Sequence, residues 1–114
     1  MITKIPKKNK LYTYRVTWSE EDQEYVGLCA EFPSLSWLAD TQLEAIEGIN
    51  KLVSDVLLDM QSNNEIPPEP LSTKHYSGKL IVRIPSHVHR KLAIKAAESR
   101  VSLNRYISSK LAEE

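Results

Sequence analysis

Cationic and apolar side chains alternate in the stretch GKLIVRIP, residues 78–85. Successive side chains of a β-strand point to opposite faces, so Lys79, Ile81 and Arg83 would share one face. Arginine and lysine donate to O6 and N7 of guanine, and an apolar side chain can contact the methyl group of thymine. The pattern therefore predicts a strand that reads base edges. A plainer interpretation is that these charges only keep a sheet edge soluble.

This predicted strand needs a partner, because no second strand pattern follows before the chain ends. Either it returns to a sheet upstream, or it pairs with its own copy from a second chain. Helical patterns follow, the first capped by Ser86 and the second by Ser102. A strand and two helices bury too little area to be stable alone, and modules this small need a metal, disulfides or a partner chain. Cys29 is the only cysteine, so the chain can form no intrachain disulfide and has no zinc-type cluster of ligands. The remaining possibility is a partner chain, and we infer a homodimer.

A two-fold axis lets two copies of the strand pair antiparallel as a ribbon that fits the major groove. The other strand face and the apolar helix positions then form the predicted dimer core, namely Leu80, Val82, Ile84, Val88, Leu92, Leu103, Ile107 and Leu111. Ser102 and Asn104 lie at the start of the second helix, where free amides and the positive end of the helix dipole hold a phosphate group.

An N-terminal unit of three strands and a helix is predicted upstream. The strands are expected over 11–18, 24–32 and 34–39, with Gly27 marking a bulge or a close backbone approach. Thr41 and Glu44 form a capping box, and the apolar stripe that follows predicts a helix ending within 61–65. The stripe comprises Leu43, Ile46, Ile49, Val53, Val56, Leu57 and Met60. The segment IPPEP, 66–70, disfavours helix, so the predicted modules are 1–70 and 71–114.

The formal net charge of zero hides two oppositely charged parts. Residues 11–70 hold twelve acidic and two basic side chains, a net charge of −10, and residues 76–114 hold eight basic and three acidic ones, a net charge of +5. The basic part is expected to attract nucleic acid and the acidic part a basic partner. The first ten residues, MITKIPKKNK, are charged with no apolar run behind them, so we expect a soluble cytoplasmic protein that binds no membrane.

Residues 76–114 resemble a ribbon-helix-helix DNA-binding module, and the whole chain resembles the HicB family of type II antitoxins. The resemblance rests on Asp40–Thr41 with Glu44–Ala45, the proline-rich linker and the strand GKLIVRIP. It implies an α+β protein with an N-terminal βββα module like a partial RNase H fold, which binds a small basic HicA-like toxin that cleaves mRNA. The C-terminal module would bind palindromic operator DNA and repress its own operon, with base readout by Lys79, Ile81 and Arg83 and phosphate contacts by Ser102 and Asn104. Higher oligomers of the dimer are left open.

This sequence departs from the family pattern at two positions. Relatives often carry a polar residue where Ile81 stands, and Arg100 occupies the position after a helix where glycine is favoured. One alternative is a solitary DNA-binding regulator whose N-terminal module serves assembly or binds another ligand. Another is a residual nuclease using carboxylates such as Glu31 and Asp40. We expect no enzyme activity and no cofactor.

Two further residue pairs have competing interpretations. Trp18 and Trp37 are predicted core residues, with a partner-anchoring role for one of them as the alternative. His87 and His89 are two positions apart, so they do not share a helix face, and we expect no metal site but exposed or phosphate-facing side chains.

Overall fold

The computed structural model describes residues 9–113, which form two compact units divided between Tyr76 and Ser77. The elements are β1 (Tyr14–Ser19), β2 (Glu24–Cys29), β3 (Ser36–Ala39), α2 (Gln42–Ser62), α3 (Ser86–Glu98) and α4 (Leu103–Ala112). The predicted α+β class, a three-stranded antiparallel sheet followed by helices, is confirmed. The sequence placed the boundary after residue 70. The prediction of a soluble cytoplasmic protein was drawn from the first ten residues, and residues 1–8 of these lie outside the described part of the chain.

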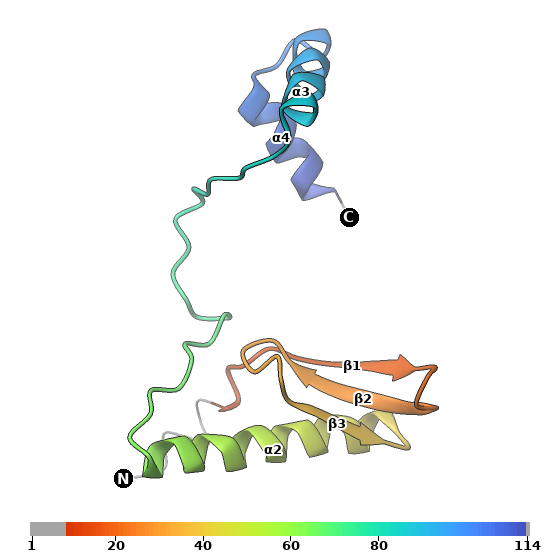
Figure 1. Ribbon diagram of the computed structural model, residues 1–114, viewed down its shortest axis with the longest axis vertical. Helices are drawn as coiled ribbons and strands as arrows, with labels where there is room; N and C mark the ends of the chain where they lie inside the picture. Colours follow the sequence, from red (N-terminus) through yellow and green to blue (C-terminus); the bar gives the residue numbers. More distant parts are fainter. Residues whose placement is uncertain (1–8, 114) are drawn as a thin grey trace. The chain divides into compact units, whose positions relative to one another are not determined.

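The N-terminal unit is a sheet of order β1-β2-β3 with α2 packed on one face (Figure 1). Val16, Gly27 and Trp37 are directly paired across the three strands, in an antiparallel register that continues without a bulge. A β-carbon on Gly27 would lie 2.5 Å from the carbonyl oxygen of Ala45 in α2. The close backbone approach expected at Gly27 is therefore confirmed, and it lets the helix lie directly on the central strand.

Helix α2 begins at the predicted Thr41 cap, with the Thr41 half of the capping box formed, and it ends within the predicted range. The Thr41 hydroxyl accepts a hydrogen bond from the Glu44 amide at 3.1 Å. At the other end Asn64 adopts a left-handed conformation with φ of +58°, and the Glu65 amide donates to the carbonyl of Met60 at 2.8 Å. These bonds satisfy amide and carbonyl groups that helix ends leave unpaired.

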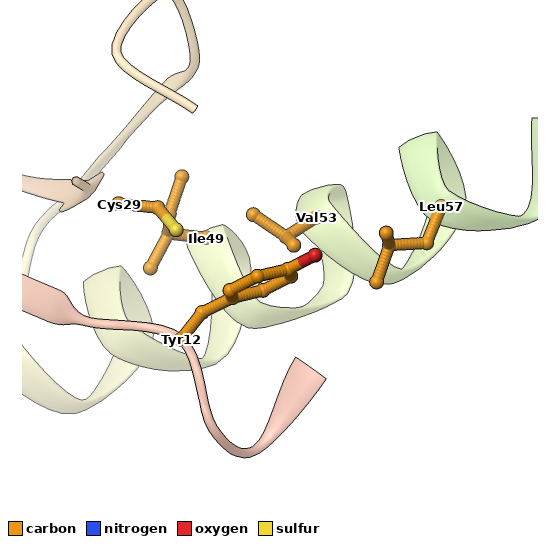
Figure 2. Close-up of a cluster of buried hydrophobic side chains, with 5 residues drawn as sticks. All are labelled: Tyr12, Cys29, Ile49, Val53 and Leu57. Atoms are coloured by element: carbon orange, nitrogen blue, oxygen red, sulfur yellow. The ribbon is translucent and has the colours of Figure 1, made fainter. Parts of the chain in front are cut away.

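The apolar stripe of α2 supplies most of the core of the N-terminal unit. Ile49, Val53 and Leu57 are fully buried and form one cluster with Tyr12 and Cys29 (Figure 2). Cys29 is thus a small core residue. The prediction was wrong for Leu43, the first residue of the apolar stripe, because its side chain is 65% exposed.

The proline-rich segment is docked on the N-terminal unit, and we call residues 67–72 the strap. The Tyr12 hydroxyl donates to the carbonyl of Pro68 at 2.8 Å. The Leu71 amide donates to the Glu31 carboxylate at 2.9 Å, and the Ser72 hydroxyl donates to the carbonyl of Leu11 at 2.6 Å. Pro70 is buried. These contacts explain why the structural boundary lies beyond the prolines.

The C-terminal unit packs α3 against α4, and Ala96 is its buried residue. The turn between the helices holds Arg100 at φ of +59°, and the Val101 amide donates to the carbonyl of Ala96 at 3.1 Å. Arg100 therefore adopts the left-handed conformation at the position after the helix where glycine is favoured. The predicted cap at Ser86 is wrong. Pro85 is the N-cap residue, and its carbonyl accepts from the amides of the first helical turn.

Candidate nucleic-acid interface

The stretch 79–85 leads into α3 without joining a strand (Figure 1). The sheet of the N-terminal unit is formed by β1, β2 and β3, and residues 79–85 form no strand of it. A strand requires a neighbour that exchanges backbone hydrogen bonds. Pairing with a second copy therefore stays a prediction. In the single chain the Lys79 amide donates to the Ser77 hydroxyl at 3.1 Å and the Pro85 carbonyl accepts from the first turn of α3, so the residues left to pair are 80–84.

The side chains of this stretch nevertheless separate as the alternation predicts. Leu80, Val82 and Ile84 line an open groove of about 800 Å³ against α3 and α4, whereas Ile81 is 96% exposed and lies outside its lining. Lys79 and Arg83 are exposed, although Lys79 also borders the groove. The cationic face is thus accessible from solvent, with Lys79 at its rim.

The groove collects most of the predicted dimer core. Seven of the eight residues line it, namely Leu80, Val82, Ile84, Leu92, Leu103, Ile107 and Leu111. Val88 is half-buried and does not line the groove. Leu80 and Leu111 are each 72% exposed in the single chain. An apolar groove with side chains this exposed is typical of a surface that another molecule covers.

Two groove residues were missed from the sequence. His89 is exposed, as expected, and it also lines the groove; its position three residues before Leu92 was the available signal for the groove. Lys110 also lines it, with its Nζ 3.4 Å from a carboxylate oxygen of Glu113 and 5.6 Å from the centre of the Tyr106 ring. Both side chains of this ion pair are exposed, so the pair contributes little stability.

The predicted phosphate site lies at the start of α4. The Ser102 hydroxyl caps this helix by accepting a hydrogen bond from the Arg105 amide at 3.0 Å, as predicted. The amides of Leu103 and Asn104 precede the first intrahelical hydrogen bond, and Ser102 and Asn104 are both exposed. Asn104 also lines the groove. The geometry allows an anion to approach, but phosphate binding itself stays a prediction.

The tryptophans of the N-terminal unit are not core residues, contrary to the main prediction. Trp18 is 45% exposed and Trp37 43%. Trp18 packs edge-on against Tyr25 with ring centres 5.1 Å apart, and its indole nitrogen donates to the Glu20 carboxylate at 3.0 Å. Hydrogen bonds from Trp18 and Gln23 hold the pKa of Glu20 below its ordinary value. An aromatic pair is therefore presented at an acidic hairpin.

The carboxylates considered for nuclease chemistry do not converge. Glu31 accepts hydrogen bonds from the Thr13 amide, the Thr13 hydroxyl and the Leu71 amide, and Asp40 lies just before the cap of α2. Burial raises the pKa of Glu31, but these hydrogen bonds outweigh that effect and hold it below its ordinary value. Within residues 9–113 no group of three potential metal-ligating side chains occurs. Glu31 thus has a structural use.

Comparison with known proteins gives one match. The model of the HicB family matches residues 63–111. The match covers 49 of the 114 residues, so it shows a similarity of the C-terminal part of the chain to that family. The matched region includes the strap, α3 and all of α4 except its last residue, and leaves β1, β2, β3 and α2 outside it. No curated protein and no solved structure matches the chain. In the described part of the chain, no helix is long and apolar enough to cross a membrane.

Proposed function

We propose that this protein is the antitoxin of a type II toxin-antitoxin system, in which the C-terminal unit binds operator DNA as a ribbon-helix-helix dimer. The observation that carries the proposal is the open apolar groove, which gathers seven predicted core residues and leaves Ile81 outside. A second copy, pairing through 79–84, would cover both grooves across a two-fold axis. The operator would then be palindromic, with half-sites related by the same axis.

In this dimer the outward strand face contacts DNA. Lys79 and Arg83 would donate to guanine in the major groove, and Ile81 would contact a thymine methyl group. Ser102 and Asn104, beside the free amides at the start of α4, would bind phosphate and fix the register. The net charge of +5 on residues 76–114 supports this role because it favours release of counterions from DNA.

The DNA proposal is tested by titrating the purified protein with duplex DNA from upstream of its own gene. Lys79→Ala combined with Arg83→Ala should remove the preference for that DNA over a scrambled duplex. A matched control, Lys91→Ala with Lys95→Ala, removes the same charge from α3 and should keep the preference. Each double variant should also flatten the salt dependence of binding, in proportion to the number of phosphate charges that the protein no longer neutralises. Unchanged preference in the first variant would show that the strand face is misassigned.

We propose further that the N-terminal unit, a partial RNase H-like module, neutralises a small basic HicA-like ribonuclease. The mechanism is steric and stoichiometric, so no residue of this chain acts as a catalyst. The net charge of −10 on residues 11–70 supports a basic partner, and tryptophan is favoured where a partner anchors. Co-expression with the neighbouring reading frame tests this. The frame should be toxic alone and harmless together with this protein.

Trp18 gives this test a matched pair of variants. Trp18→Ala should weaken toxin binding, whereas Trp37→Ala, which removes an equally exposed indole lying against Gly48, should not. If Trp37→Ala weakens toxin binding and Trp18→Ala does not, the residue that anchors the toxin is Trp37, at the β3 edge of the sheet. A neighbouring frame that is absent or not toxic favours the second candidate, a solitary regulator. That candidate draws support from the family match, which leaves the three strands outside it.

A further inference from the structure

The strap joins parts of the chain that lie far apart in sequence. Its three hydrogen bonds to the N-terminal unit link residues 40 to 61 positions apart. They are made by Leu71 with Glu31, by Pro68 with Tyr12 and by Ser72 with Leu11. A flexible connector would leave its backbone groups hydrogen-bonded to water and not to one module. These bonds therefore point to a defined docked state.

The chemistry of the strap suits docking and release. Proline restricts φ and lacks an amide, so Pro67, Pro68 and Pro70 lose little backbone freedom and leave few unpaired donors when they dock. Only Pro70 is buried, and the other strap residues are half-buried or exposed. A segment held by few buried contacts and by solvent-accessible hydrogen bonds is expected to open locally without global unfolding.

Glu31 is the central contact. One carboxylate oxygen accepts from both the Leu71 amide and the Thr13 hydroxyl, at 2.9 and 3.1 Å, and the other accepts from the Thr13 amide. Thr13 belongs to the chain entering β1, so this side chain ties the strap to the edge of the sheet. Hydrogen bonds to a charged acceptor are stronger than neutral ones.

We propose that the strap is a latch with Glu31 as its fastening residue, and that its opening changes the free length of chain between the two units. With the latch closed, the chain is held as far as Lys74, because the Thr73 and Lys74 amides donate to the carbonyl of Pro70 at 3.3 and 3.1 Å. Two residues, 75 and 76, then remain before the C-terminal unit begins at Ser77, and they span at most about 7 Å. With the latch open, the chain is free from 66 to 76, eleven residues that span at most about 37 Å. Because the tether sets the effective concentration of one unit for a ligand held by the other, the latch controls coupling between them. The inference does not require either ligand proposed above.

Amide exchange of the full-length protein, followed by NMR, tests the latch at one atom. The Leu71 amide should exchange far more slowly than an unstructured amide in the natural protein. Glu31→Gln keeps an acceptor but removes its charge, and should accelerate this exchange by about tenfold. Tyr12→Phe keeps the ring that packs edge-on against Phe32 and removes only the bond to Pro68, and should accelerate it less. Glu24→Gln, which neutralises an acid at the far end of β2, should leave it unchanged.

Limited chymotrypsin digestion provides a second readout, since cleavage after Leu71 requires an open strap. Cleavage should rise in Glu31→Gln and Tyr12→Phe while the amides of α2 stay protected, which separates latch opening from unfolding. A Leu71 amide that is unprotected in the natural protein, or that exchanges equally in all four proteins, would overturn the proposal. So would loss of α2 protection in step with Leu71.

Discussion

Leu80→Ala tests the apolar groove, because Leu80 is 72% exposed in the single chain and lines that groove. Burying a leucine side chain fully contributes about 1.5–3 kcal/mol, so covering the exposed part contributes about 1–2 kcal/mol per chain. A two-fold dimer contains this contact twice. Because alanine keeps the β-carbon, we expect a loss of about 2–3 kcal/mol per dimer, which raises the dimer dissociation constant roughly 30- to 150-fold.

Sedimentation equilibrium over a concentration series measures this constant directly. The matched control is Ile81→Ala, since Ile81 adjoins Leu80 and is 96% exposed but does not line the groove. It should leave the dissociation constant within about twofold, because a surface substitution changes stability little. Equal weakening by the two variants would refute the alternation of faces, and no weakening by Leu80→Ala would refute burial of the groove.

Three further substitutions or conditions test the fold. Gly27→Ala should destabilise the N-terminal unit by about 1–3 kcal/mol in thermal unfolding, because its β-carbon would meet the Ala45 carbonyl at 2.5 Å; an unchanged melting temperature would contradict this close approach. Arg100→Gly should stabilise the C-terminal unit by about 0.5–1 kcal/mol in urea unfolding, since glycine adopts φ of +59° without strain, and destabilisation would contradict the turn. The pKa of Glu31 is lowered in the folded protein, so its stabilising contribution is complete above the unfolded pKa of about 4.3 and is lost as the pH falls through the lower folded pKa. The protection of the Leu71 amide, corrected for intrinsic exchange, should therefore fall as the pH drops below about 4.3 and stay constant between pH 5 and 7.

That pH response is expected to come from the Glu31 carboxyl group alone. The other titratable groups that interact with it are the Tyr12 and Tyr14 hydroxyls and the Cys29 thiol. Burial raises the pKa of Tyr12 to about 12 and also raises the pKa values of Tyr14 and Cys29, so all three stay neutral throughout the acidic range. A protection change centred near neutral pH would therefore point to a different group.

Local patterns predicted the elements well because they depend on neighbours in sequence. The hydroxyl of Thr41 and the three- and four-residue spacing of Ile49, Val53 and Leu57 define α2 without knowledge of the rest of the chain. The alternation around Ile81 likewise separated groove residues from outward ones, except at Lys79, which also lines the groove. In each case the signal lies within one turn or one strand.

What the sequence did not reveal depends on contacts between distant residues. The bond between Glu31 and the Leu71 amide spans forty positions and leaves no periodic pattern, so the strap looked like a free linker. Trp18 and Trp37 looked like core residues from their hydrophobicity, but only the position of α2 over the sheet decides how much of each ring is covered. The strand that pairs with residues 79–84 is likewise not revealed by local sequence, because pairing needs a second strand.

The most direct test of that pairing is an isotope-filtered NOE experiment on dimers mixed from labelled and unlabelled protein. We expect backbone contacts between chains, confined to residues 79–84 and arranged symmetrically as in an antiparallel pair, where facing α-carbons approach to about 4.5–5.5 Å. Contacts from these residues to β1 or β3 of their own chain, or a monomer without contacts between chains, would contradict the proposed ribbon.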